Sequence, residues 1–108
     1  MNILNLTPHA VRILSPDGTE ITTLPPSGEI ARVSVTRVSG SPIAGLPVFH
    51  SSFGAVVGLP PAVEGTALVV SAMVRSACPA RRDVFSPGEL RRDAAGQPTG
   101  CVGLEGNL

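Results

Sequence analysis

The number and placement of glycines and prolines constrain the fold of this chain most. The 108 residues include 12 glycines and 11 prolines, which fall at short intervals between β-branched and apolar runs. Both residues interrupt helices and favour turns, whereas β-branched residues favour strands. We therefore expect a mainly β protein (a β-rich α+β fold) made of short strands and hairpins, with one short helix near residues 72–78.

The expected strands are the segments between these turns. They cover residues 2–7, 10–15, 19–24, 31–36, 48–51, 55–57, 65–70, 89–93 and 99–104. The sequence Ser15-Pro16-Asp17-Gly18 has the residues of a tight turn and predicts a hairpin between the second and third strands. We expect further turns at 25–28, 86–88 and 94–97, and a loop over 40–47.

Two strands have informative patterns. Ala31, Val33 and Val35 alternate with polar residues, which predicts a strand with one solvated face and places Arg32 on that face. The run 66–70 is apolar throughout, so we expect it in the interior of the sheet. Ser71 then occupies the position of a helix N-cap, and Pro79 limits the following helix to about two turns.

Composition limits the partners. The length fits one domain, residues 1–108. Arginine supplies all eight positive charges and eight carboxylates balance them, so the chain lacks the basic character of nucleic-acid-binding proteins. No apolar run reaches the roughly 20 residues of a membrane span, and no secretion signal is recognisable, so we expect a cytoplasmic protein with no membrane partner. In that compartment Cys78 and Cys101 are expected to be reduced.

Motifs for catalysis or metal binding are missing from the sequence. It contains no C-x-x-C, H-E-x-x-H or G-x-S-x-G pattern and no phosphate-binding loop. His9 and His50 are far apart in sequence, and a small hydrolase or nuclease would require the fold to bring both of them to Asp83. We therefore expect a protein that is not an enzyme and has no metal or cofactor.

A candidate anion site follows the apolar strand. Ser71 and the helix start offer a hydroxyl and backbone N–H groups, Arg75 lies one turn later, and Arg81 and Arg82 follow the helix. Guanidinium groups suit phosphate and carboxylate. The alternative is that Ser71 only caps the helix and that the arginines pair with Asp83, Glu89 or Asp93 on the surface.

Two further residues are candidates for ligand binding. His9 interrupts two apolar strands, where it is either a ligand donor or a cap for the turn. Asp83 either orients Arg75 or Arg82 or is an ordinary loop carboxylate. The sequence leaves both alternatives open.

Several short motifs together resemble a family of small uncharacterised proteins of bacteriophages and prophages. These motifs are Asn5-Leu6-Thr7-Pro8-His9, Pro26-Ser27-Gly28, Ala31-Arg32-Val33, Phe53-Gly54, Gly58-Leu59-Pro60, Val69-Val70-Ser71, Asp83-Val84-Phe85-Ser86-Pro87-Gly88 and Arg92-Asp93. The resemblance spans nearly the whole chain and implies no catalytic residue. It implies a phage accessory protein that acts by binding.

Two functions fit these observations. The first is non-catalytic binding of a phosphorylated or nucleotide-derived small molecule, such as a host immune signal, in a pocket of a homo-oligomer. The second is a protein-interaction module, an inhibitor or virion accessory protein, that binds a partner through strand edges and apolar residues.

Overall fold

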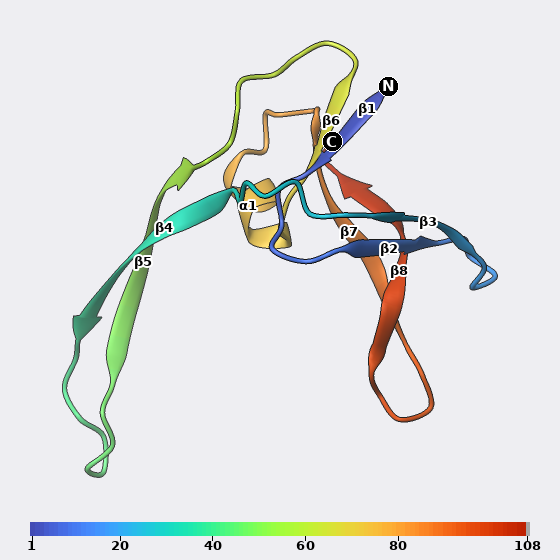
Figure 1. Cartoon of the computed structure of the whole chain (residues 1–108). Helices are drawn as coiled ribbons and strands as arrows, with labels where there is room; N and C mark the ends of the chain where they lie inside the picture. Colours follow the sequence, from blue (N-terminus) through green and yellow to red (C-terminus); the bar gives the residue numbers. More distant parts are fainter. Residues whose placement is uncertain (108) are drawn as a thin grey trace.

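The protein is described by a computed structural model that covers residues 1–107. In this part of the chain the strands exceed the single helix by far, which confirms the expected β-rich fold (Figure 1). The elements are β1 (Asn2–Asn5), β2 (Val11–Leu14), β3 (Glu20–Leu24), β4 (Arg32–Ser39), β5 (Phe49–Val57), β6 (Thr66–Val69), α1 (Ala72–Ala77), β7 (Val84–Arg92) and β8 (Pro98–Gly106).

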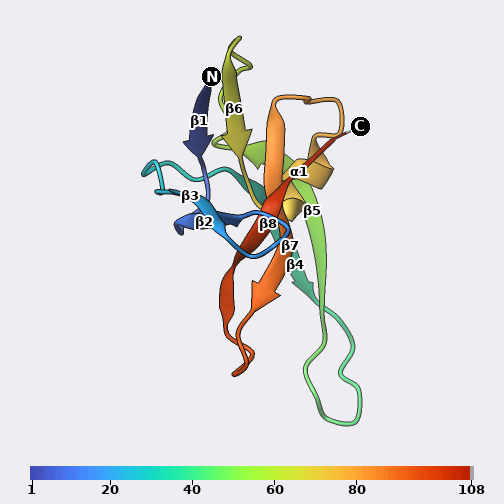
Figure 2. The ribbon, with the colours of Figure 1, turned by 90° about the vertical axis from the view of Figure 1, so that its right-hand side faces the viewer.

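Six strands form one mixed sheet in the order β1-β6-β7-β8-β2-β3 (Figures 1 and 2). β6 pairs in parallel with β1 and β7, and β8 pairs antiparallel with β7 and parallel with β2. The two edge strands of the sheet, β1 and β3, lie close together: the side chain of Asn5 on β1 donates to the carbonyl oxygen of Leu24 on β3 at 3.0 Å. The sheet is therefore nearly closed.

β6 lies in the interior of this sheet, as its apolar sequence predicts. Leu68 and Val70 belong to one buried cluster, which also contains Leu6 and Val74, whereas Val69 belongs to a second cluster with Val11, Ile13 and Cys101. Successive side chains of a strand point to opposite faces. Because both faces of β6 are covered, the segment has no polar alternation.

The first hairpin forms where the turn residues predict it. β2 and β3 pair antiparallel, and the N–H of Gly18 donates to the Ser15 carbonyl oxygen at 2.9 Å. Gly18 has a φ of 90°, which explains why glycine is used here. The Asp17 carboxylate accepts hydrogen bonds from the Ser15 hydroxyl and from the Thr19 N–H, and these bonds lower its pKa from 3.8 to about 2.

The turn makes a prediction for acid titration. Asp17 is expected to be half-protonated near pH 2, because its hydrogen bonds favour the charged form. The turn's contribution to stability is thus fully present above pH 3.8 and is lost as the pH falls through 2. Carboxyl chemical shifts measured by NMR across this range test the prediction. In Ser15→Ala the same pKa should rise toward 3.8, and a wild-type value near 3.8 would contradict the described turn.

The turn expected at 86–88 is wrong, since these residues lie within β7. Ser86 and Pro87 are paired with Glu105 and Leu104 of β8. Gly88 has the turn-forming residue type for another reason: a Cβ at this position would collide with the backbone of Val102 and Gly103. Glycine here permits close approach of two strands and does not end one.

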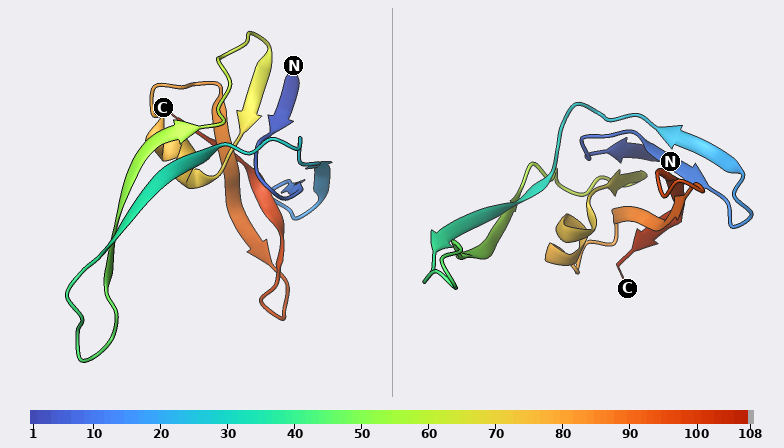
Figure 3. Two further views of the ribbon diagram at one scale, coloured as in Figure 1. Left: turned by 60° about the vertical axis from the view of Figure 1, so that its left-hand side comes forward. Right: turned by 90° about the horizontal axis from the view of Figure 1, so that it is seen from below.

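β4 and β5 form a separate two-stranded sheet, and we call residues 32–57 the β4–β5 arm (Figure 3). The two strands expected at 48–51 and 55–57 are one continuous strand, because Gly54 allows Ser34 of β4 to approach closely. Arg32 is exposed and Val33 buried, as the alternation predicts. Val35 differs from the prediction and is 53% exposed, because the arm leaves the rest of the molecule there.

The helix expected near residues 72–78 is present, which confirms that prediction. α1 covers Ala72–Ala77, with Ser71 as the N-cap, and buries Val74 against the sheet. Cys78 ends the helix, and both Cys78 and Cys101 are free thiols.

No helix within residues 1–107 has the length and apolar character needed to cross a lipid bilayer.

Candidate functional site

A broad, largely apolar pocket of about 630 Å³ lies beside the start of α1. Its walls are residues 7–12 from the β1–β2 loop and β2, Ser71 and Ala72 from the helix start, and parts of the β7–β8 hairpin. Leu90 and residues 98–101 supply the hairpin side. Three segments distant in sequence thus line one open pocket. Its volume lies within the roughly 300–1,000 Å³ of small-molecule sites.

Two of the predicted ligand-binding residues, His9 and Ser71, line this pocket. The Ser71 hydroxyl accepts from the Val74 N–H at 3.3 Å, so it also caps the helix. His9 is exposed, and its main-chain carbonyl oxygen accepts a hydrogen bond from the side-chain amide of Asn5 at 2.9 Å, with the Thr7 hydroxyl oxygen also 2.9 Å away. The hydrogen bonds to the backbone of His9 thus fix this loop at the pocket wall.

Asn5 organises this part of the site and was not singled out as a candidate from the sequence. It is 2% exposed, and its amide nitrogen donates to the carbonyl oxygens of His9 and Leu24 at 2.9 and 3.0 Å. Its side-chain oxygen accepts from the N–H and the hydroxyl of Thr7 at 2.9 and 2.6 Å. One buried amide therefore joins β1, the His9 loop and β3. An asparagine between an apolar strand and Thr-Pro is the signal that could have indicated it.

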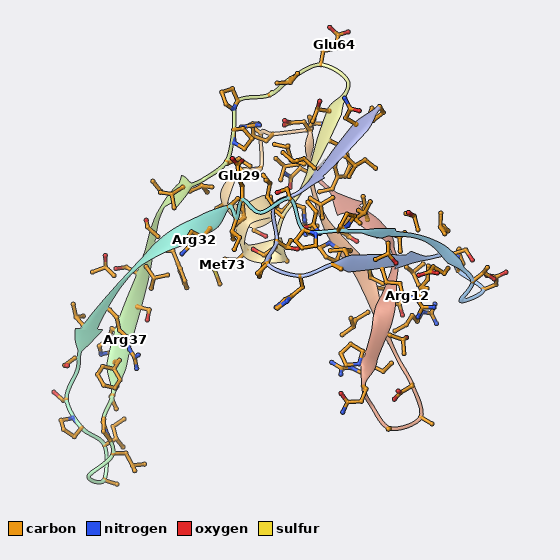
Figure 4. The ribbon with its side chains drawn as sticks, in the orientation of Figure 1. Arg12, Glu29, Arg32, Arg37, Glu64 and Met73 are labelled. Atoms are coloured by element: carbon orange, nitrogen blue, oxygen red, sulfur yellow. The ribbon has the colours of Figure 1, made fainter. Side chains whose placement is uncertain are left out.

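Arg12 also lines the pocket and was not singled out as a candidate from the sequence. Its Nε donates to a Glu20 carboxylate oxygen at 2.9 Å and its Nη1 to the Thr99 carbonyl oxygen at 3.0 Å. Figure 4 shows Arg12 on the side of the molecule where β2 meets β8. The Thr23 hydroxyl and Arg12 lower the pKa of Glu20, although the pair is half exposed and water screens it. Arg12 is exposed between the buried residues Val11 and Ile13 of β2. The alternation of apolar and polar residues in the sequence could have indicated this exposed position.

Arg75 takes a different role from the predicted one. Its Nε donates to the hydroxyl of Ser86 at 2.8 Å, and its Nη1 lies 3.4 Å from the side-chain oxygen of Asn107. Ser86 is 1% exposed. Arg75 therefore ties the helix to β7 and to the C-terminal segment, and it is not among the residues that line the pocket.

Arg82 and Asp83 also lie outside the pocket lining. Arg82 is exposed in the turn between α1 and β7. Asp83 accepts two hydrogen bonds from Arg81, both at 2.8 Å, and these bonds lower its pKa. Asp83 thus pairs with Arg81, which confirms the alternative that an arginine after the helix pairs with this carboxylate, and it orients neither Arg75 nor Arg82. Arg81 in turn donates to the Pro60 carbonyl oxygen.

The residues considered for hydrolysis are on separate elements. His9 lies in the β1–β2 loop, His50 lies on the β4–β5 arm opposite Val38, and Asp83 precedes β7. Within residues 1–107, no group of three or more His, Cys, Asp or Glu side chains gathers to hold a metal ion.

Burial raises the pKa of the Cys78 thiol, which donates to the Val74 carbonyl oxygen.

Comparison of the chain with protein-family models, with curated proteins and with solved structures gives no match. The chemistry of the site therefore rests on its own geometry. The apolar walls suit a flat organic group, and the polar residues among the lining include Ser71, His9 and Arg12, which carry a hydroxyl, an imidazole and a guanidinium. Such groups bind oxygen atoms of an anion or a sugar.

Proposed function

We propose that this chain is a non-catalytic binding protein for a phosphorylated or nucleotide-derived small molecule. The proposal rests mainly on the pocket of about 630 Å³, where apolar walls meet polar residues at the rim, among them Ser71 and Arg12 in its pair with Glu20. A nucleotide has the same division, with a flat base at one end and an anionic phosphate at the other. The base would lie against Leu90 and Val11, and the anion would lie near Arg12, His9 and Ser71.

The resemblance to phage proteins suggests the purpose of such binding. A protein that binds without reacting removes a small molecule from solution, which would suit an anti-defence protein that sequesters a nucleotide-derived immune signal in the host cytoplasm. The pocket is broad and open, so we propose that a second copy of the chain covers its open side in a homo-oligomer.

The alternative function is a protein-interaction module, acting as an inhibitor or virion accessory protein. One observation favours it: apolar side chains are exposed along the β4–β5 arm, including Phe49 and Phe53 at 48% and 60%. Such a surface suits a protein partner. Binding of a small molecule and an apolar contact between proteins are compatible when the partner is another copy of the chain.

Two substitutions at Ser71 test ligand binding without disturbing the helix. Asparagine and aspartate are both good N-caps, so Ser71→Asn and Ser71→Asp should melt at nearly the wild-type temperature. Aspartate also adds a negative charge to the pocket rim, and it should weaken binding of an anionic ligand by about tenfold or more relative to asparagine. Isothermal titration calorimetry with a panel of nucleoside mono-, di- and cyclic phosphates provides the comparison.

The two histidines supply a control. His9→Ala should weaken the same ligand, whereas His50→Ala, on the arm and outside the pocket lining, should bind as the wild type does. Equal affinities for Ser71→Asn and Ser71→Asp, together with wild-type binding by His9→Ala, would refute this pocket as the site of an anionic ligand.

A further inference from the structure

The isolated chain is larger than a folded monomer of its mass. Its radius of gyration is 16.7 Å, where a compact domain of this length has about 13 Å. Its accessible surface is 7122 Å², where a monomer of this mass exposes about 5,600 Å². Figure 3 shows the source of the difference, because the β4–β5 arm projects away from the main sheet.

One face of the arm is apolar and exposed. Val35 is opposite Phe53, and Arg37 and Phe49 occupy alternate positions further along the same face. Val35 and the two phenylalanines are each about half exposed or more, at 53%, 60% and 48%. A two-stranded ribbon is marginally stable in water without a surface to pack against. This face therefore lacks the cover that a stable hairpin needs.

The arm and the rest of the chain have opposite charges. The arm contains Arg32 and Arg37 and no carboxylate, and because the whole chain has no net charge, the remainder carries two excess negative charges. Arg37 lies 4.0 Å from the centre of the Phe49 ring, on the exposed apolar face. Figure 4 shows both arginines along the arm, whereas Glu29 and Glu64 lie outside it. Two arms would repel each other, but an arm and the remaining surface of another copy attract.

We propose that the β4–β5 arm docks on the six-stranded sheet region of a second copy of this chain, and that reciprocal docking of the two arms forms a twofold dimer. The area supports this occupant. The excess surface of about 1,500 Å² per chain amounts to about 3,000 Å² in a reciprocal pair, which lies in the range of obligate homodimers. The apolar face supplies the centre of the contact and Arg32 and Arg37 its charged part.

Sedimentation velocity of the ligand-free protein tests this assembly separately from the proposed small-molecule binding. The wild-type protein should sediment as a dimer of the 11.0 kDa chain. The double variant Val35→Ser/Phe53→Ser should raise the dissociation constant by roughly 100-fold, about tenfold for each truncated interface residue. The control Val63→Ser removes a side chain that is equally exposed, at 61%, but lies in the loop before β6, outside both the arm and the six-stranded sheet, and it should remain a dimer.

A charge reversal keeps the test valid if the double variant does not fold. Arg37→Glu should weaken the dimer, because it lowers the net charge of the arm from two positive charges to none and so removes its attraction to the acidic remainder of the partner. Arg82→Glu, an exposed residue in the turn between α1 and β7, should not weaken it. A monomeric wild type at about 100 μM, far above the dissociation constants of obligate dimers, would overturn the proposal. A tighter dimer in Arg37→Glu would also overturn it, since that result indicates arms packed on each other.

Discussion

Replacing Val70 by aspartate is expected to abolish folding. Val70 is 0% exposed and belongs to the buried cluster with Leu6, Val74 and Val84. Its N–H also donates to the Phe85 carbonyl oxygen at 2.8 Å, so it continues the pairing of β6 with β7. Burying an unpaired carboxylate costs several kcal/mol, which is about the entire stability of a small domain.

Val63→Asp is the matched control for this prediction. Val63 is 61% exposed in the loop before β6, so the same chemical change there should alter the free energy of unfolding by about 0.5 kcal/mol or less. Urea titration followed by circular dichroism should show a cooperative transition for the wild type and Val63→Asp and none for Val70→Asp. A cooperative transition in Val70→Asp would show that β6 is not part of the core.

Replacing Asn5 by leucine should have the next largest effect, a loss of about 3 kcal/mol in the free energy of unfolding. Leucine has the same number of side-chain heavy atoms, branched at the same carbon, but it cannot form the four side-chain hydrogen bonds that join Asn5 to Thr7, His9 and Leu24. Each polar group left unpaired and buried costs about 1–3 kcal/mol, although water can reach the partners on the exposed loop. The loss is thus smaller than four full penalties.

The same substitution should also affect the pocket. Asn5 holds the carbonyl oxygen of His9, so Asn5→Leu releases the loop that forms one pocket wall. Ligand affinity should fall in conditions where the variant is still folded. Asn2→Leu changes the same residue type at an exposed position on β1 and should leave both stability and affinity nearly unchanged. Wild-type stability of Asn5→Leu, measured by urea unfolding, would disprove the role of Asn5.

Much of the sheet could be predicted because it depends on local signals. The turn at Ser15–Gly18, the apolar run at 66–70 and the N-cap at Ser71 each act within a few residues, and each is found where expected. The errors arose where a glycine serves a contact distant in sequence. Gly54 and Gly88 have the residue type of a turn, but each allows a neighbouring strand to come close.

The candidate site was less predictable, because it depends on which way side chains point in the folded chain. Ser71 and Arg75 are one helical turn apart, but the buried Ser86 hydroxyl draws the guanidinium toward β7. Arg12 reaches the pocket because β2 pairs with β8, a parallel contact between the two ends of the chain. Nothing in the local sequence around residue 12 indicates that pairing.

The exposed face of the β4–β5 arm was also not predictable from the sequence. The pattern at 31–35 predicts a strand with one buried face, and the single chain buries that face only as far as Val33. Beyond Val33 the same face continues with Val35 and Phe53, which remain exposed in the single chain. A pattern of alternation indicates that a face needs cover, but it does not say whether the cover belongs to the same molecule.

Native mass spectrometry measures the number of subunits and the retained ligand in one spectrum, with protein purified from cells and then mixed with the panel of nucleoside phosphates. We expect a homo-oligomer that retains one phosphorylated small molecule for each pocket and releases it on denaturation. Folded protein that shows no ligand mass with any member of the panel would contradict the proposed binding function.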